Sequence, residues 1–169
     1  MKPLTQTLFS VVLFSFVLFS CSKEDDGIYF NETNEEIVTI ENVSYSEIEN
    51  EILNLVNEYR QSINLNTLST LNIISSVADG HTNYMIQTGE VSHANFSERA
   101  QTLMNDANAK SVGENVAYGF NSAQGVVNGW LNSEEHKKII EKSDYTHFGI
   151  STDSNDEGRN YFTQIFIKK

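Results

Sequence analysis

The segment that most constrains the fold lies near the end of the chain, at residues 161–167, and is apolar on both faces that a β-strand presents. Successive side chains of a strand point to opposite faces, so a strand with one face in water alternates apolar and polar residues. This segment lacks that alternation, and both of its faces need cover. The sequence therefore predicts a sheet packed between two layers of helices.

Two further segments are predicted as strands of the same sheet. Residues 146–152 and 160–168 form a hairpin, since the loop between them, residues 153–158, is rich in Asp, Asn and Ser and ends in Gly. Residues 112–118 are predicted as a third strand, with Gly113 near its start and Gly119 directly after its end. The expected sheet is small and antiparallel, with about three strands.

Helical periodicity accounts for most of the remaining chain. The first helix begins at a capping box, Ser46 with Glu49, and runs to about residue 63. The second is capped by Ser69 or Thr70 and ends at Gly89. The loop at residues 92–99 runs into a short third helix capped by Asn95 or Ser97, and two more helices are expected at 122–132 and 134–142. The fold class is therefore α+β, with the core expected to contain four aromatic side chains, Trp130, Phe148, Phe162 and Phe166.

The first twenty residues are predicted to be a leader rather than part of the fold. Lys2 precedes an apolar run at residues 8–19, which is shorter than the roughly 20 helical residues that a bilayer requires. We therefore divide the chain into a signal peptide at 1–20, a polar tether at 21–45 and one folded domain at 46–169.

Cys21, the only cysteine, follows Ser20 directly after the apolar run. This arrangement resembles a bacterial lipobox, in which the cysteine sulfur is acylated after cleavage; the alternatives are a free thiol and an ordinary signal peptide. The acidic residues at 24–26 resemble the signal that sends lipoproteins of the Bacteroidetes group to the outer face of the outer membrane, or else form only a solvated tether. We expect an exported protein attached to the outer membrane by its lipid.

Charge and cysteine content exclude several classes of protein. The formal net charge is −12, and loss of the leader, which carries one Lys and no acid, makes it −13. Such a chain repels phosphate backbones, so nucleic-acid binding is not expected. One cysteine allows no internal disulfide, and the domain must rely on its apolar core. The acidic hairpin loop is not a calcium loop, because its twelfth position is Gln164.

A group of polar residues stands out from these patterns. Glu114 lies inside an apolar strand, where a carboxylate needs partners, and His93, Glu134 and His136 lie in flanking segments. A fold that brings them together would form a pocket of imidazoles and carboxylates. His81 faces inward on the second helix and is expected to be a hydrogen-bonded core residue.

Two other charged or titratable residues are expected to lie outside this pocket. We expect Arg99 to pair with an acid on the surface. His147 is expected to start a strand without a chemical role.

Several motifs in this order resemble the CAP superfamily of cysteine-rich secretory, antigen 5 and pathogenesis-related proteins, in its cysteine-poor bacterial branch. The resemblance covers about residues 48–167. Its motifs are residues 57–60, 78–85, 92–93, 113–115, 130–136, 148–150 and 162–166. It implies an α-β-α sandwich with a cleft that holds two histidines and two glutamates.

The resemblance assigns cleft positions to His93, Glu114 and His136. The second glutamate falls at Ser133 with Glu134 beside it, so Glu134 or Glu135 either completes the cleft or faces solvent. His93 and His136 could bind Zn²⁺, with Glu114 orienting an imidazole or acting as a third ligand. The alternative is a metal-free, hydrogen-bonded cluster.

Three kinds of function follow from such a cleft. A binding module would take sterols, fatty acids, other amphiphiles or protein partners, as members of the family do. A hydrolase of peptide or cell-wall material would use His93, Glu114 and His136 in general-base or metal-assisted catalysis. A plain interaction protein would use the cluster only as a polar core. The oligomeric state is not predicted.

Overall fold

The structure is a computed structural model that describes residues 43–169. The predicted leader, Cys21 and nearly all of the tether lie outside these residues. Within them, the elements are α1 (Glu47–Ser62), β1 (Ser69–Thr70), α2 (Asn72–Thr88), α3 (Phe96–Asp106), β2 (Ser111–Tyr118), α4 (Ala123–Asn132), α5 (Glu134–Ile140), β3 (His147–Ser154) and β4 (Asn160–Lys168). None of the described helices is both long and apolar enough to span a bilayer.

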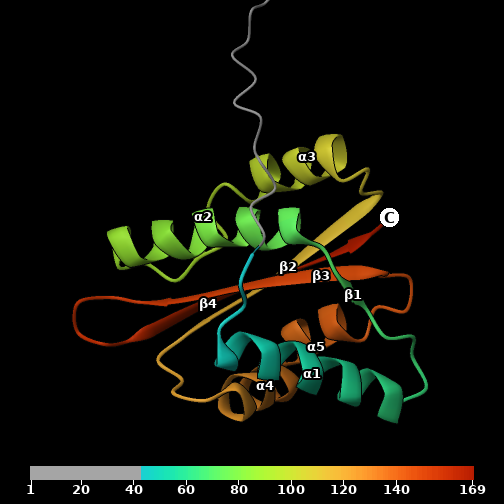
Figure 1. The fold of residues 1–169 in the computed structure, drawn as a ribbon, viewed down its shortest axis with the longest axis horizontal. Helices are drawn as coiled ribbons and strands as arrows, with labels where there is room; N and C mark the ends of the chain where they lie inside the picture. Colours follow the sequence, from blue (N-terminus) through green and yellow to red (C-terminus); the bar gives the residue numbers. More distant parts are fainter. Residues whose placement is uncertain (1–42) are drawn as a thin grey trace, which may run out of the picture. The chain divides into compact units, whose positions relative to one another are not determined.

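The four strands form one mixed sheet in the order β1-β3-β4-β2. The β2–β4 and β3–β4 pairs are antiparallel, whereas the two-residue β1 runs parallel to β3. Helices α2 and α3 cover one face of the sheet, and α1, α4 and α5 cover the other (Figure 1). The predicted α+β class and α-β-α layering are confirmed.

Strand β4 explains the layering. It lies between β3 and β2, and all of its residues from Tyr161 to Ile167 are buried. Phe162 and Phe166 pack with Trp130 and Phe148 on the side of α1, α4 and α5, while Ile165 and Ile167 pack toward α2 and α3. Each such side chain contributes about 1.5–3 kcal/mol when it is fully buried.

The start of α2 differs from the prediction. Ser69 and Thr70 do not cap this helix but form β1, and their neighbour Leu71 precedes the helix without a side-chain cap. The Ser69 N–H donates to the carbonyl of Thr146, and the Leu71 N–H donates to that of Phe148. The backbone here is therefore satisfied by β3 rather than by a capping side chain, and this adds a fourth strand to the three that were expected.

Two predicted helix boundaries are confirmed. Ser46 caps α1, and Glu49 completes the capping box by accepting from the Ser46 N–H at 2.8 Å. Gly89 ends α2 with φ of +71°, a left-handed conformation that favours glycine. This ending allows the chain to turn into the loop that carries His93.

Candidate functional site: a cleft at the edge of strand β2

Glu114 lies on β2, on the face of the sheet that α2 and α3 cover, and is only 3% exposed. Arg99 of α3 binds its carboxylate with two hydrogen bonds, from Nε to Oε2 and from Nη2 to Oε1, each 2.8 Å long. The same guanidinium donates to the carbonyl of Ala94 at 2.6 Å. The partner that a buried glutamate requires is therefore an arginine, held by a planar, bidentate contact.

His93 completes the surroundings of this carboxylate. Its Nδ1 lies 2.8 Å from Glu114 Oε1, and about half of the side chain is exposed. Because an ionised carboxylate only accepts hydrogen bonds, Nδ1 carries the proton that it donates. The other ring nitrogen, Nε2, then presents a lone pair, and none of the hydrogen bonds within residues 43–169 engages it.

His81 forms a hydrogen bond with the loop that carries His93. The ring is 2% exposed, and its Nε2 lies 2.7 Å from the carbonyl oxygen of Ser92, the residue before His93. Burial lowers the pKa of His81, although the contact with Ser92 and the charge of Glu114 act in the opposite direction. His81 is thus a hydrogen-bonded core residue, as predicted, and it fixes the backbone that carries His93.

The pKa of Glu114 results from opposing effects. Burial alone would raise it, but the hydrogen bonds from His93 and Arg99, together with the charge of Arg99, lower it below its ordinary value. Glu114 is therefore ionised at neutral pH. With both oxygens engaged by donors, it is poorly suited to remove a proton from a substrate or water.

His136 approaches the cleft from α5, in the helix layer opposite to Arg99. Its Nδ1 lies 2.7 Å from Ser133 Oγ, and its backbone carbonyl accepts from Asn115 Nδ2 at 3.2 Å. Burial lowers the pKa of His136, protonation of His93 would lower it further, and Glu135 partly opposes this. His93 and His136 thus approach β2 from opposite faces of the sheet, through their contacts with Glu114 and Asn115.

The positions of three charged residues decide which side chains surround Glu114. The Glu134 side chain is 83% exposed and pairs with Lys138 of its own helix at 3.0 Å, and Glu135 pairs with the same lysine. Neither carboxylate contacts His93, Glu114 or His136. Arg99, expected on the surface, is the partner of buried Glu114, so that expectation was wrong.

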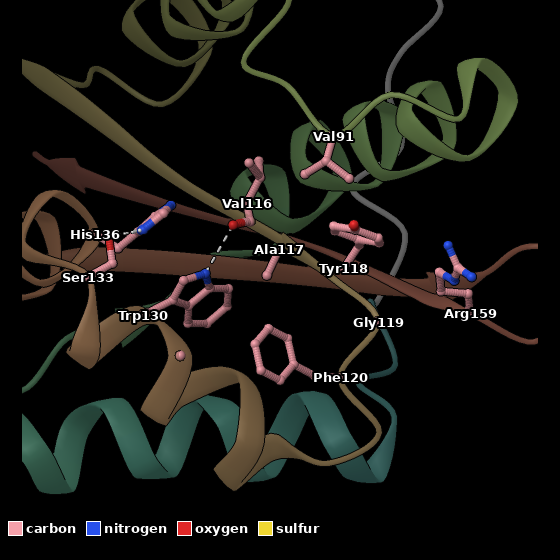
Figure 2. A pocket seen from close by; sticks show the side chains of 11 residues that line it. Val91, Val116, Ala117, Tyr118, Gly119, Phe120, Trp130, Ser133, His136 and Arg159 are labelled. Atoms are coloured by element: carbon pink, nitrogen blue, oxygen red, sulfur yellow. Dashed lines mark hydrogen bonds between the residues drawn. The ribbon is translucent and has the colours of Figure 1, made fainter.

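A cavity of about 690 Å³ extends along the free edge of β2. Apolar side chains form most of its wall, and His136 and Arg159 lie toward its two ends (Figure 2). The Trp130 indole N–H donates to the carbonyl of Val116 at 3.1 Å, which holds the ring against the strand. The remaining lining residues are Val91, Ala117, Tyr118, Gly119, Phe120, Gly129 and Ser133.

The two cleft histidines have the donor chemistry of metal ligands. Each Nδ1 is oriented by an oxygen of the protein, Glu114 for His93 and Ser133 for His136, and such contacts typically fix metal-binding imidazoles. No group of three or more His, Cys, Asp or Glu side chains within residues 43–169 is arranged to hold a metal. An ion bound here would take two ligands from the protein and the rest from water or from a bound molecule.

Comparisons with known proteins identify the family and the fold. A model of the family described as "CAP: Cysteine-rich secretory protein family" matches residues 53–166. The chain is 36% identical over 124 residues to the "Uncharacterized membrane protein YlbC" of Bacillus subtilis (strain 168), which covers 72% of this chain and 34% of that protein. The chain thus spans about a third of this relative's length.

Two solved structures have the same fold. An outer surface protein from Borrelia burgdorferi has a TM-score of 0.68 and 23% identity, with 75% of this chain and 96% of that chain covered. An extracellular protein containing a SCP domain from Bacillus anthracis str. Ames has a TM-score of 0.63 and 28% identity, with 72% and 40% covered.

Proposed function

This chain belongs to the CAP (cysteine-rich secretory protein) family, and we propose that it is an exported, lipid-anchored binding domain whose ligand occupies the cleft at the edge of β2. In this proposal, His93 and His136 hold a divalent metal ion beside the ligand. The observation that carries it is that a protein oxygen holds Nδ1 of each imidazole, Glu114 for His93 and Ser133 for His136, and that His136 lines a cavity of about 690 Å³.

The proposed location rests on the start of the sequence. A basic residue, an apolar run and then Cys21 form the pattern of a cleaved and acylated leader. The words "membrane", "outer surface" and "extracellular" in the names of similar proteins support export. The acyl chains would attach the domain to the outer membrane, with the acidic segment after Cys21 as a tether.

The proposed metal is Zn²⁺, since imidazole nitrogens are among its preferred ligands. A bound Zn²⁺ would supply a positive charge and an open coordination position for an oxygen of the ligand. Glu114 would hold His93 in the tautomer that leaves Nε2 free, and the Ser133 hydroxyl, when it accepts from Nδ1, would allow the same tautomer in His136. Both side chains would therefore act by orienting the ligands.

The lining of the cavity favours a ligand with apolar groups. Tyr118, Phe120 and Trp130 offer aromatic surface, and the polar groups lie toward the ends at His136 and Arg159. This pattern suits an amphiphile of the sterol or fatty-acid kind, and equally a segment of a protein partner. Hydrolysis has less support, because both oxygens of Glu114 accept hydrogen bonds from Arg99 or His93 and its pKa is lowered. Such a carboxylate is a weak general base.

Thermal unfolding with added Zn²⁺ tests the metal site. The protein from Ser22 onward should unfold at a higher temperature, with about 2.7 kcal/mol of stabilisation when free Zn²⁺ reaches about 100 times its Kd. The double variant His93→Ala/His136→Ala should lose this gain, whereas His147→Ala, at the start of β3, should keep it. Absence of a gain in the wild type, or an equal gain in the double variant, would contradict the proposal.

A further inference from the structure

The sheet has two edges, which differ in how the outward backbone groups of the edge strand are hydrogen-bonded. At one edge, β3 is covered by β1 over two residues, Ser69 and Thr70. Beyond β1, the Ile150 N–H donates to Ser75 Oγ at 3.1 Å, and the Thr152 N–H donates to Glu49 Oε1 at 2.7 Å. Side chains from α2 and α1 thus engage two outward N–H groups of β3, which limits the exposure of this edge.

The other edge is β2, which pairs only with β4. The Gly119 N–H donates to the carbonyl of Asn160, so residue 119 directs its backbone groups toward β4. Because hydrogen-bonding direction alternates along an antiparallel strand, residues 116 and 118 direct theirs away from β4. The contact of Val116 O with the Trp130 indole confirms this direction.

The outward groups of β2 beside the cavity are largely without partners. Trp130 engages the carbonyl of Val116, but no hydrogen bond within residues 43–169 engages the Val116 N–H or the N–H and carbonyl of Tyr118. Residues 116–119 line the cavity, as Figure 2 shows for Val116 and Tyr118. The wall of the cavity therefore offers two backbone donors and one acceptor along about 10 Å of strand.

A polypeptide in extended conformation complements such a wall. Its own N–H and C=O groups would pair with Tyr118 and Val116, and alternate side chains would enter the apolar space beside Phe120 and Trp130. Arg159, about half exposed at one end, lies 3.9 Å from exposed Glu157, and this loose pairing would leave it able to attract a carboxylate of the ligand. A fatty acid or sterol would fill the apolar space but leave the backbone groups of Tyr118 unpaired.

We propose that the ligand of this cleft is an extended segment of a partner polypeptide, three to four residues long, which adds to β2 as a fifth strand with an acidic group beside Arg159. This inference rests on the proposed binding function and specifies the class of its ligand. Strand addition requires no metal, so the proposed peptide binding and the proposed metal site can fail independently.

A small peptide set tests this inference. Sixteen peptides Ac-Ser-Φ-Thr-Φ-Asp-Ser-NH₂, with Φ as Val, Leu, Phe or Tyr and a fluorescent label on the first Ser, are titrated with the protein from Ser22 onward. Fluorescence polarisation should show saturable binding by at least one peptide. In that peptide, N-methylation of single backbone amides should weaken binding about tenfold or more at every second residue, as expected when a hydrogen bond is lost.

Variants at residue 118 supply the matched controls. Tyr118→Pro removes an N–H that points away from β4, so it costs no hydrogen bond of the sheet and should weaken peptide binding about tenfold or more. Tyr118→Ala keeps the N–H and should weaken binding less. Thermal unfolding establishes that both variants fold. The N-methylated peptides test the inference on the wild-type protein, so that test does not depend on either variant.

The outcomes separate this inference from the proposed metal site. Saturable binding with alternating N-methyl effects supports strand addition. Binding by none of the sixteen peptides, equal N-methyl effects at all positions, or unchanged binding by folded Tyr118→Pro would overturn it, even with the Zn²⁺ stabilisation intact. Peptide binding without Zn²⁺ stabilisation would overturn the metal site alone.

Discussion

The two histidines of the cleft are held by different chemistry. His93 contacts a buried carboxylate, Glu114, whose charge Arg99 balances with two hydrogen bonds. His136 contacts the neutral hydroxyl of Ser133, and its backbone carbonyl accepts from Asn115. One side of the cleft therefore contains a buried ion pair, and the other contains only neutral hydrogen bonds.

This difference indicates how each side contributes. Breaking a buried ion pair by removing one partner leaves an uncompensated charge, so the His93 side is tied to the stability of the fold. A neutral hydrogen bond contributes much less, and the lowered pKa of His136 keeps its ring neutral and able to accept a metal. We infer that the His136 side can vary with little effect on folding.

The largest effect is expected from Glu114→Gln. The change leaves the guanidinium of Arg99, whose side chain is 11% exposed, without its counter-ion, and should lower the free energy of unfolding by about 3–5 kcal/mol. Urea unfolding at neutral pH measures it. The double variant Glu114→Leu/Arg99→Met removes both charges and should lose less than the single change; a larger loss would contradict the role of the ion pair.

Glu114 and the buried histidines should respond to acid in different pH ranges. The folded pKa of Glu114 is below its ordinary 4.5, so its contribution is present above that value and is lost as the pH falls through the folded pKa. The folded pKa values of His81 and His136 are below 6.5, so their contributions are lost in a higher range.

Urea unfolding from about pH 8 to about pH 3, with EDTA present, separates these ranges. His136→Gln should make the loss of stability in the upper range less steep, with His81 and His147 supplying the remainder. It should leave the lower range unchanged. If His136→Gln changed the free energy of unfolding only in the lower pH range, the assignment of a neutral His136 ring would be wrong.

The sequence predicts the layers of this fold better than the contacts within the cleft. Residues 161–167 need cover on both faces wherever they are placed, so the α-β-α order follows from local composition. Strand β1 was missed because two residues carry no periodic pattern, and Thr146 and Phe148, which supply its hydrogen bonds, lie far away in sequence.

The pairing of Arg99 with Glu114 was missed for a related reason. A glutamate within an apolar strand signals that a partner exists, but its own neighbours in the sequence do not identify that partner. Only the orientation of α3 over β2 determines that Arg99 reaches inward rather than to solvent. His93 and His136 were singled out because they lie in segments that flank Glu114, and the family resemblance then related the two positions.

A smaller effect is expected from Ser133→Ala. The change removes the hydroxyl that orients His136, and the loss should be about 0.5–1.5 kcal/mol, as for a neutral hydrogen bond. The Ser133 side chain makes no capping bond to α5, so no capping loss is added. Urea unfolding measures the change, with Ser133→Thr, which keeps a hydroxyl, as the control. A loss as large as that of Glu114→Gln would remove the contrast between the two sides.

The smallest effect is expected from Glu134→Gln, which asks whether the His136 side has a carboxylate of its own. The side chain is 83% exposed and pairs only with Lys138, so the free energy of unfolding should change by less than about 0.5 kcal/mol. The Zn²⁺ stabilisation should also stay the same, with Lys138→Gln as the control for the lost ion pair. A reduced response to Zn²⁺ in Glu134→Gln alone would show that this carboxylate reaches the cleft when metal binds. The His136 side would then be anionic, as the His93 side is, and the difference between them would apply only to the metal-free protein.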